Sequence, residues 1–384
     1  MKIQSTCLIC FNLIFFFLSI NASAQTEEGW QASKQVVEKL SKERSEFNYI
    51  EEKVPAYKLP DLFISVDRTK INTPDLWNNF RRPEIIELFR KNVYGRVPVT
   101  PYEKSFKVVN IEKNSMDGSA TLKQIDITII SEKKSLVIHL TLFTPDKIKK
   151  PVPVFLLIDN WGPGNTVPDW KLKGEFWPVK EAIERGYGMA VFSSSDLDPD
   201  DFDNFKNGIH GLLDKNPRPD DAWGTIAAWA WGASRCMDYL VTDKDVAPEK
   251  VAVVGHSRAG KTALWAGAED TRFAMVISNE SGAGGASLAR RRFGETVSRL
   301  NSAFPQWFCS NYNKYSGKED SLPVDMHMLL ALIAPRALYI DCADPPLNKQ
   351  IISGEVAFHI RDGVHNLLLN DWNWFKDFAD KVLK

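Results

Sequence analysis

A serine lies at the junction between an apolar run and a helix-like stretch in the segment 251–267. Where a buried strand turns sharply into a helix, a serine in the turn presents its hydroxyl at the top of the sheet, and backbone N–H groups of the helix N-terminus can stabilise an oxyanion there. Gly255 precedes the serine by two residues, Ala259 takes the place of the usual second glycine, and Gly260 follows. This context predicts that Ser257 is a nucleophile. The alternative is a serine that only caps a helix.

Three histidines follow Ser257 and could act as its base. A serine nucleophile needs a base within hydrogen-bond reach and a carboxylate that orients the base, and one large class of hydrolases carries them in the order serine, acid, histidine. His327 is predicted inside a helix, and His359 is predicted inside a strand, where it would pack or hydrogen-bond structurally. His365 follows that strand in a turn containing glycine. The sequence therefore favours His365 as the base.

Carboxylates follow two of the predicted strands that come after the serine. Glu280 stands in the loop after the strand at 274–277, and Asp341 and Asp344 follow the strand at 337–340. A carboxylate in a loop is ordinarily a solvated surface group. These three lie at the carboxyl ends of strands, where open α/β sheets bind their ligands. The residues alone leave open which carboxylate orients the histidine.

The elements that must position these groups follow from the hydrophobic pattern. Alternating apolar and polar residues over 106–143 predict antiparallel strands. Beyond them, short apolar runs alternate with helical stretches such as 222–240. The runs are 152–158, 188–192, 251–254, 274–277 and 337–340. This pattern predicts an α/β fold of the α/β-hydrolase kind, a mostly parallel central sheet flanked by helices in a three-layer sandwich.

The N-terminal residues differ in composition from the rest. Residues 1–24 combine a lysine, a short apolar core and small residues before Gln25, the pattern of a secretory signal peptide cleaved after Ala24. The apolar core is too short to span a membrane, and no cysteine follows the small residues to carry a lipid anchor. Residues 25–60 are predicted to form a helical segment packed on the main domain, which covers 61–384. We therefore expect a secreted or periplasmic protein without a membrane anchor.

Composition excludes some classes of partner and site. The 384 residues carry a net charge of −1, which provides no basic face for nucleic acid. Removal of a signal peptide would leave three of the five cysteines, Cys236, Cys309 and Cys342, so at most one internal disulfide could form. The spacing does not select the pair. No C-x-x-C motif or histidine-rich cluster points to a metal, and none is expected. Hydrolysis by serine and histidine requires no cofactor.

Several short motifs together resemble one known family. They are Arg-Arg-Pro-Glu-Ile at 81–85, Tyr-Gly-Arg-Val-Pro at 94–98, Trp-Gly at 223–224, Asp-Tyr-Leu at 238–240, Gly-His-Ser-Arg-Ala-Gly-Lys at 255–261, Asn-Glu-Ser-Gly at 279–282, Gly-Glu-Thr at 294–296, Phe-Pro-Gln-Trp-Phe at 304–308 and Leu-Ile-Ala-Pro-Arg at 332–336. In these motifs the chain closely resembles the glucuronoyl esterases, carbohydrate esterase family 15, over nearly all of the mature sequence.

The resemblance implies roles for the residues that match the family's motifs. Ser257 would be the nucleophile, His365 the base and Glu280 the acid. Arg258 would stabilise the oxyanion with its guanidinium and its backbone N–H, because a fixed cation lowers the energy of charge that develops in the transition state. A surface ion pair is the alternative for Arg258. The second acid of many bacterial members would fall near Asp344.

Three further residues are implied to bind the substrate. Lys261 and Glu295 resemble family residues that contact sugar hydroxyls, and Trp307 is placed with them. Lys261 could otherwise be a solvated lysine in the first turn of a helix, and Trp307 could belong to the core, as most tryptophans are highly buried.

The chain departs from the family pattern at two places. His256 stands where some members, especially the fungal ones, carry a cysteine, so a bridge through that position is absent, and we expect His256 to be packed rather than catalytic. The family's acidic, tryptophan-containing loop and helix before the last strand are replaced by a short passage between Ile340 and Gly354. Substrate contacts from that loop are therefore expected to be missing.

Taken together, the resemblance predicts an exported serine esterase. It would cleave, through an acyl-enzyme, the ester between (4-O-methyl-)glucuronic acid on xylan and an alcohol such as lignin. One alternative is an acetyl-xylan esterase or another carbohydrate esterase, because a triad does not define the acyl group. The other is a weakly active or non-catalytic carbohydrate-binding relative, which the retained Ser257, His365 and Glu280 disfavour.

Overall fold

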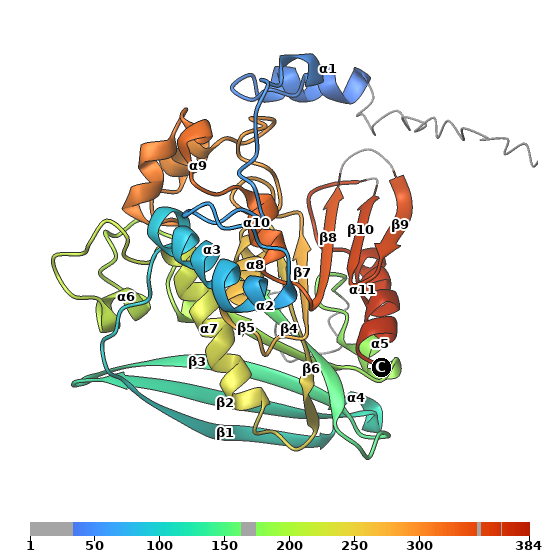
Figure 1. Ribbon diagram of the computed structural model, residues 1–384. Helices are drawn as coiled ribbons and strands as arrows, with labels where there is room; N and C mark the ends of the chain where they lie inside the picture. Colours follow the sequence, from blue (N-terminus) through green and yellow to red (C-terminus); the bar gives the residue numbers. More distant parts are fainter. Residues whose placement is uncertain (1–33, 163–173, 344–346, 362) are drawn as a thin grey trace, which may run out of the picture. The chain divides into compact units, whose positions relative to one another are not determined.

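The computed structural model describes residues 34–162, 174–343, 347–361 and 363–384. Within them ten strands form one sheet, in the order β1-β2-β3-β5-β4-β6-β7-β8-β10-β9 (Figure 1). The strands are β1 (Glu103–Asn114), β2 (Ala120–Ser131), β3 (Lys134–Pro145), β4 (Val152–Asp159), β5 (Gly188–Ser193), β6 (Val246–His256), β7 (Met275–Asn279), β8 (Ala337–Ala343), β9 (Leu347–Ser353) and β10 (Val356–Arg361).

The middle of the sheet is parallel and its two ends are antiparallel. Strands β5, β4, β6, β7, β8 and β10 run parallel to one another. Strands β1, β2 and β3 join them antiparallel at one end of the sheet, and β9 pairs antiparallel with β10 at the other. The predicted antiparallel strands and the predicted mostly parallel core are both confirmed.

Helices cover both faces of this sheet. The α-helices are α1 (Lys34–Glu43), α2 (Pro74–Leu76), α3 (Arg82–Phe89), α4 (Ser115–Gly118), α5 (Val179–Glu184), α6 (Gly208–Leu213), α7 (Thr225–Leu240), α8 (Arg258–Glu269), α9 (Val297–Ala303), α10 (Met326–Ala331) and α11 (Leu369–Val382). Short 3-10 or π turns are η1 (Glu51–Lys53), η2 (Trp77–Arg81), η3 (Arg90–Tyr94), η4 (Ser194–Asp196), η5 (Ser310–Tyr315) and η6 (Glu319–Ser321).

Strand β4 shows why the fold has three layers. All of its residues are buried, and alternate side chains enter two different cores. Leu156 packs in the core that holds α3, α7 and α8, whereas Phe155 packs in the core that holds α5 and α11. A strand buried on both faces reads as a continuous apolar run, which is the pattern from which the parallel sheet was predicted. The predicted α/β-hydrolase architecture is therefore confirmed.

The register of the parallel strands aligns four polar residues across the sheet. His256 at the end of β6 is opposite Asn279 in β7, Asn279 is opposite Asp341 in β8, and Asp341 is opposite His359 in β10. All four side chains are buried. The row lies at the carboxyl ends of the parallel strands, the edge at which open α/β sheets bind ligands.

The N-terminal segment is described only from Lys34. Helix α1 has no buried residue, although its apolar residues lie on one face. The chain after it contacts the main body through an Asn48–Gly294 bridge and an edge-to-face contact of the Tyr49 and Phe293 rings at 6.1 Å. The predicted signal peptide at 1–24 lies outside the described residues. No helix of the described residues is long and apolar enough to cross a membrane.

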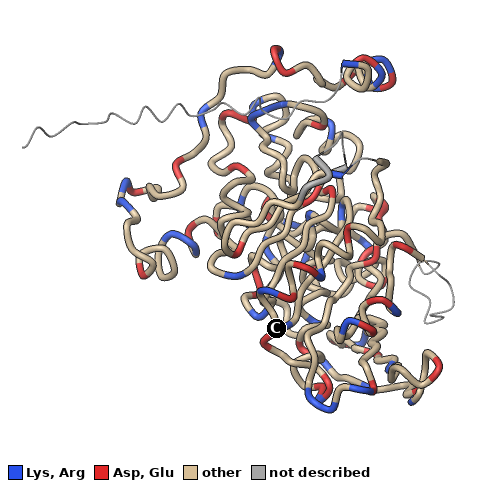
Figure 2. Tube along the Cα trace, turned by 90° about the vertical axis from the view of Figure 1, so that its right-hand side faces the viewer, with Lys and Arg blue, Asp and Glu red and all other residues tan. Residues whose placement is uncertain are grey.

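The distribution of charged residues and the state of two cysteines can be compared with what the composition suggests. Basic and acidic residues are interspersed along the chain in the view of Figure 2, as the net charge of −1 suggests. Cys236 on α7 and Cys309 are both buried and are not bridged to each other. Burial raises the pKa of the Cys309 thiol to about 12, which keeps it protonated and unreactive at neutral pH.

Candidate active site

Ser257 occupies the predicted turn between β6 and α8. Its backbone has φ 58° and ψ −121°, a conformation that is strained for a non-glycine residue. The flanking glycines are needed for close approach: a Cβ on Gly255 would lie 1.9 Å from the carbonyl oxygen of Ala259, and one on Gly260 would lie 2.8 Å from that of Asn279. The delayed glycine at 260 therefore has its own steric reason, and the predicted strand–turn–helix context is confirmed.

His365 and Glu280 complete a hydrogen-bonded series with Ser257. The Nε2 atom of His365 lies 3.0 Å from Ser257 Oγ, and its Nδ1 atom pairs with Oε2 of Glu280. The imidazole is 57% exposed, whereas the Glu280 side chain is only 4% exposed. A hydroxyl, an imidazole and a buried carboxylate in this order can transfer a proton from the hydroxyl and stabilise the imidazolium that results.

The other two histidines have different partners. His327 on α10 forms a hydrogen bond of 3.0 Å to the carbonyl oxygen of Pro60. His359 in β10 is buried between the Tyr339 hydroxyl, at 2.9 Å, and Asp371, at 3.1 Å. Of the three candidates, the structure thus places His365 against Ser257.

Two of the three candidate carboxylates are described. Glu280, directly after β7, has a left-handed backbone with φ 49° and contacts His365. Asp341 in β8 accepts a hydrogen bond of 2.5 Å from Asn279 Nδ2 and lies 3.4 Å from His359 Nε2. Burial, and then the charge of Asp371, raise the pKa of Asp341 well above its usual range. Asp344 lies outside the described residues.

Arg258 begins α8 directly after the serine. Its guanidinium pairs with Asp200 and lies 5.0 Å from the centre of the Trp307 ring. Asp200 also accepts hydrogen bonds from Gln306, at 2.9 Å, and from the Trp307 indole, at 2.7 Å. The Nε atom of Arg258 is buried without a hydrogen-bond partner among the described residues. The ion pair with Asp200 therefore holds the Arg258 guanidinium next to the turn that carries Ser257, and, among the described residues, the Nε–H of Arg258 remains free to donate a hydrogen bond.

The three predicted substrate-binding residues lie together. Lys261 is 3% exposed, so it is not a solvated lysine, and its Nζ donates a hydrogen bond of 2.5 Å to the carbonyl oxygen of Ser281. Burial lowers the pKa of Lys261 to about 8, while the charge of Glu295 opposes the change. The Lys261 ammonium lies 5.5 Å from the centre of the Trp307 ring, which stacks on Phe304 at 3.8 Å.

His256 is buried beneath the base, as expected for a packed residue. Its Nδ1 atom hydrogen-bonds Oδ1 of Asn279, and its ring centre lies 4.6 Å from that of His365. Its Nε2 atom is buried with no hydrogen-bond partner in the described structure. Burial, followed by the neighbouring His365, lowers the pKa of His256 to about 4. At neutral pH the His256 imidazole next to the base is therefore uncharged.

A buried polar cluster behind the histidine was not predicted from the sequence. Arg361 and Asp371 pair at 2.8 Å, and Arg361 also contacts Glu280 at 2.6 Å. Ligand atoms of Asp341, His359 and Asp371 lie within 4.8 Å of one another, and hydrogen bonds within the protein already engage each side chain. A signal was present: His359 and Arg361 are two ionisable residues at alternate positions of an otherwise apolar strand.

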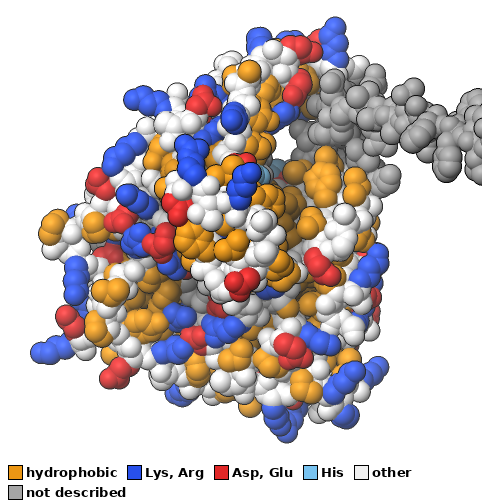
Figure 3. All heavy atoms as spheres, in the orientation of Figure 1, with side chains coloured by type: hydrophobic (Ala, Val, Ile, Leu, Met, Phe, Trp, Pro, Cys, Tyr) orange, Lys and Arg blue, Asp and Glu red, His pale blue; other side chains and the backbone are white. Residues whose placement is uncertain are grey.

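The short passage that the sequence predicts between Ile340 and Gly354 contains a further strand. Residues 347–353 form β9, which pairs with β10 as the edge of the sheet. Trp161 is 53% exposed, and its ring lies 5.9 Å from that of His256, whose ring centre lies 4.6 Å from that of His365. Val364, next to His365, is 71% exposed. In Figure 3 a histidine side chain is visible in a hollow bordered by hydrophobic side chains.

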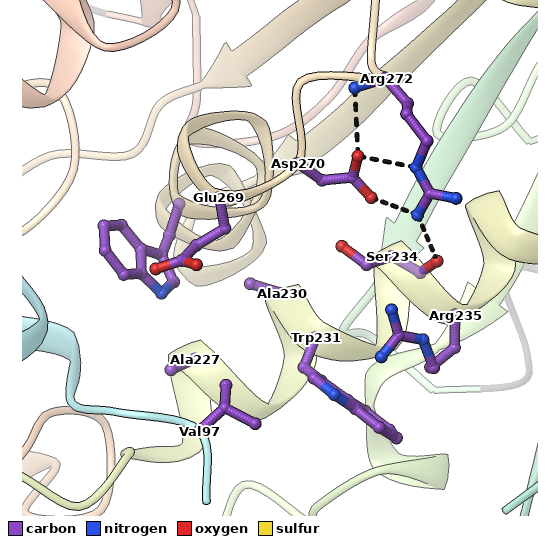
Figure 4. A pocket seen from close by; sticks show the side chains of 10 residues that line it. Val97, Ala227, Ala230, Trp231, Ser234, Arg235, Glu269, Asp270 and Arg272 are labelled. Atoms are coloured by element: carbon purple, nitrogen blue, oxygen red, sulfur yellow. Dashed lines mark hydrogen bonds and ion pairs between the residues drawn. The ribbon is translucent and has the colours of Figure 1, made fainter. Parts of the chain in front are cut away.

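A separate pocket lies at the far end of α8 (Figure 4). It has a volume of about 220 Å³ and is lined by α7 and by Glu269 and Asp270, and Arg272 pairs with Asp270 at its edge at 2.6 Å. Helix α8 has 12 residues, which corresponds to roughly 18 Å at a rise of 1.5 Å per residue. Because Ser257 precedes the other end of α8, this pocket is not part of the candidate site.

Comparison with known proteins bears on both the fold and the site. A family model described as "Glucuronyl esterase, fungi" matches residues 127–348, which include Ser257 and Glu280. The carbohydrate esterase MZ0003 from an unknown prokaryotic organism is 38% identical, over 87% of this chain and 91% of the relative. A 4-O-methyl-glucuronoyl methylesterase 1 from Wolfiporia cocos (strain MD-104) is 28% identical, over 74% of this chain and 66% of the relative. The solved structure of a glucuronoyl esterase from Solibacter usitatus is 34% identical with a TM-score of 0.81, over 87% of this chain and 100% of that one.

Proposed function

Because this chain belongs to the glucuronoyl esterases of carbohydrate esterase family 15, and is thus a carboxylic ester hydrolase, we propose that it is an exported serine esterase that cleaves esters of (4-O-methyl-)glucuronic acid on xylan. The observation that carries this proposal is the series Ser257–His365–Glu280 at the N-terminus of α8, with Lys261 and Trp307 beside it.

The first half of the reaction forms an acyl-enzyme. Ser257 Oγ attacks the ester carbonyl carbon while its proton passes to His365 Nε2, at 3.0 Å in the free protein. Glu280 stabilises the imidazolium through Nδ1. Arg258 and backbone N–H groups at the start of α8 stabilise the negative oxygen of the tetrahedral intermediate. The bond to the alcohol oxygen then breaks, and His365 gives its proton to the departing alcohol.

The second half releases the sugar acid. His365 takes a proton from water, the water oxygen attacks the acyl carbon, and the bond to Ser257 Oγ breaks as the proton returns to it. The glucuronic acid, still attached to xylan, leaves with a free carboxyl group. Proton transfer by one imidazole suffices for both halves, and no cofactor is required.

The residues around the serine support a uronate rather than an acetyl group as the acyl part. Lys261 is a buried ammonium beside the Trp307 ring, and Glu295 lies close enough to raise the pKa of Lys261. An acetyl group offers no hydroxyl to such donors and acceptors. A site built to hydrogen-bond hydroxyls rejects a substrate without them, because its buried polar groups stay unpaired.

The surface next to the base supports an apolar alcohol. Both Val364, which precedes His365 in the chain, and Trp161, which contacts the ring of His256, are exposed. Aromatic and aliphatic side chains at such a place bind rings by apolar contact. An aromatic alcohol of the lignin type fits this surface, and a lignin–carbohydrate ester is the natural substrate that we propose.

A direct competition between two esters tests the proposal. We expect kcat/KM for benzyl glucuronate to exceed that for 4-nitrophenyl acetate, and Lys261→Met to lower the first value while leaving the second nearly unchanged. A preference for acetyl esters that survives in both proteins would identify an acetyl esterase. Export is tested separately by determining the N-terminus of the secreted protein. Cleavage after Ala24 would give a mature N-terminus at Gln25.

A further inference from the structure

One buried guanidinium contacts both the acid and the loop of the base. Arg361, the last residue of β10, is 2% exposed. Its Nη2 atom donates hydrogen bonds to Glu280 Oε1, at 2.6 Å, and to the carbonyl oxygen of Asn366, at 2.5 Å. Its Nη1 atom donates to the carbonyl oxygen of Val364, at 3.0 Å, and its Nε atom donates to Asp371, at 2.8 Å. The guanidinium is therefore bound on all sides.

These contacts enclose His365. The two carbonyl groups belong to the residues on either side of it, and the Glu280 oxygen that Arg361 leaves free is the one that pairs with His365 Nδ1. The imidazole itself is more than half exposed, so little packing holds it. The group that fixes its orientation must therefore act on its backbone and on its carboxylate partner.

The far side of Arg361 is anchored in the fold. Asp371 is fully buried in the first turn of α11, where its Oδ2 atom also accepts a hydrogen bond of 2.8 Å from the Leu368 N–H. An Arg–carboxylate pair of this kind fixes both position and direction, because the guanidinium is planar and rigid. The position of the acid and of the base loop is thus tied to a helix rather than to solvent-exposed chain.

We propose that Arg361 is a positioning residue for the esterase reaction, which holds Glu280 and the 364–366 loop so that His365 meets Ser257. The proposal rests on the proposed function for the identity of the catalytic residues. Arg361 does not contact the reacting atoms, and its effect passes through His365. At metal sites, loss of a group that orients a ligand costs about 10- to 100-fold in activity, and we expect a loss of this order for Arg361.

The test compares Arg361→Met with a matched variant of another buried arginine. Arg290 is 4% exposed and donates to Asp325 and to the carbonyl oxygens of Val324 and Leu322, away from the triad. Both variants lose a buried guanidinium. We expect only Arg361→Met to lower kcat for benzyl glucuronate, roughly 10- to 100-fold with KM nearly unchanged, and Arg290→Met to lose thermal stability alone.

A second readout separates this proposal from the proposed function. The rate at which a fluorophosphonate labels Ser257 reports activation of the serine whatever the natural ester is, and we expect this rate to fall in Arg361→Met by a factor similar to that of kcat. If the wild type labels readily but does not hydrolyse glucuronate esters, the proposed function fails and the labelling rates still decide the role of Arg361.

A double-mutant cycle tests the route of the effect. If Arg361 acts through Glu280, Arg361→Met should cost much less in a Glu280→Gln background than in the wild type. The proposal would be overturned if the activity losses of Arg361→Met and Glu280→Gln simply multiplied in the double variant. It would also be overturned if the Arg361→Met protein were less stable but its Ser257 were labelled at the wild-type rate. If Arg361→Met fails to fold, Arg361→Lys is tested in its place. Lysine keeps the positive charge but cannot reach all of the acceptors, so we expect the fluorophosphonate to label Ser257 more slowly. Labelling of Arg361→Lys at the wild-type rate would contradict the proposal.

Discussion

Acid should destabilise this protein through His256. The imidazole is fully buried, and its Nδ1–H donates to Oδ1 of Asn279, since that oxygen can only accept. Protonation would place a second N–H at Nε2, which has no hydrogen-bond partner in the described structure. Burial and the adjacent His365 accordingly lower the pKa of His256 to about 4.

The sign and size of the effect follow from linkage. Between the folded pKa of about 4 and the unfolded value of about 6.5, the unfolded chain binds one proton that the folded protein does not. The free energy of unfolding therefore falls as the pH falls from 6.5 toward 4. The loss from His256 amounts to at most about 3 kcal/mol. Above pH 6.5 this residue contributes no pH dependence.

Chemical denaturation at several pH values between 4.5 and 7.5 measures this loss. In His256→Asn the amide nitrogen can replace Nδ1 as the donor to Asn279, and nothing titrates there. We expect this variant to lose clearly less stability than the wild type on acidification, whatever its stability at pH 7.5. Parallel pH curves for wild type and His256→Asn would show that protonation of His256 does not cause the loss of stability.

Three further predictions concern the reaction. His365→Ala should lower hydrolysis by several orders of magnitude, whereas His327→Ala should leave kcat unchanged; the opposite pattern in steady-state kinetics would assign the base to α10. Arg258→Ala should lower kcat about 100- to 1000-fold with little change in KM, and an unchanged kcat would limit Arg258 to its ion pair. Glu280→Ala should reduce kcat much more than Asp344→Ala, and a reversed ranking would place the orienting acid after β8.

Much of the fold could be predicted because buried parallel strands leave a plain signal. The runs at 152–158, 188–192 and 251–254 are continuously apolar since both faces of these strands are covered, and each corresponds to a strand of the structure. Strand β9 was not predicted, because it lies at the edge of the sheet. Its residues Leu347–Ser353 mix polar and apolar side chains and follow two prolines.

The candidate site could be predicted only where the backbone dictates it. Ser257 and His365 stand at a turn and a loop with local signatures, and their contact at 3.0 Å depends on the sheet that joins residues 108 positions apart. Glu280 and Asp341 could not be ranked from the residues, because each follows one of two apolar runs that form neighbouring strands, and only the fold decides which one meets the imidazole. Arg361 was missed because its place in an apolar strand indicates burial but does not identify its four partners, which only the fold brings together.

The decisive test of Ser257 as the nucleophile of a glucuronoyl esterase is the release of benzyl alcohol from benzyl glucuronate at neutral pH, measured for the wild type and for Ser257→Ala. We expect steady turnover by the wild type and a loss of several orders of magnitude in the variant, because nothing replaces the attacking oxygen. Circular dichroism establishes that both proteins are folded. Comparable turnover by a folded Ser257→Ala protein would show that Ser257 is not the nucleophile, and no turnover by the wild type would show that the protein does not cleave this ester.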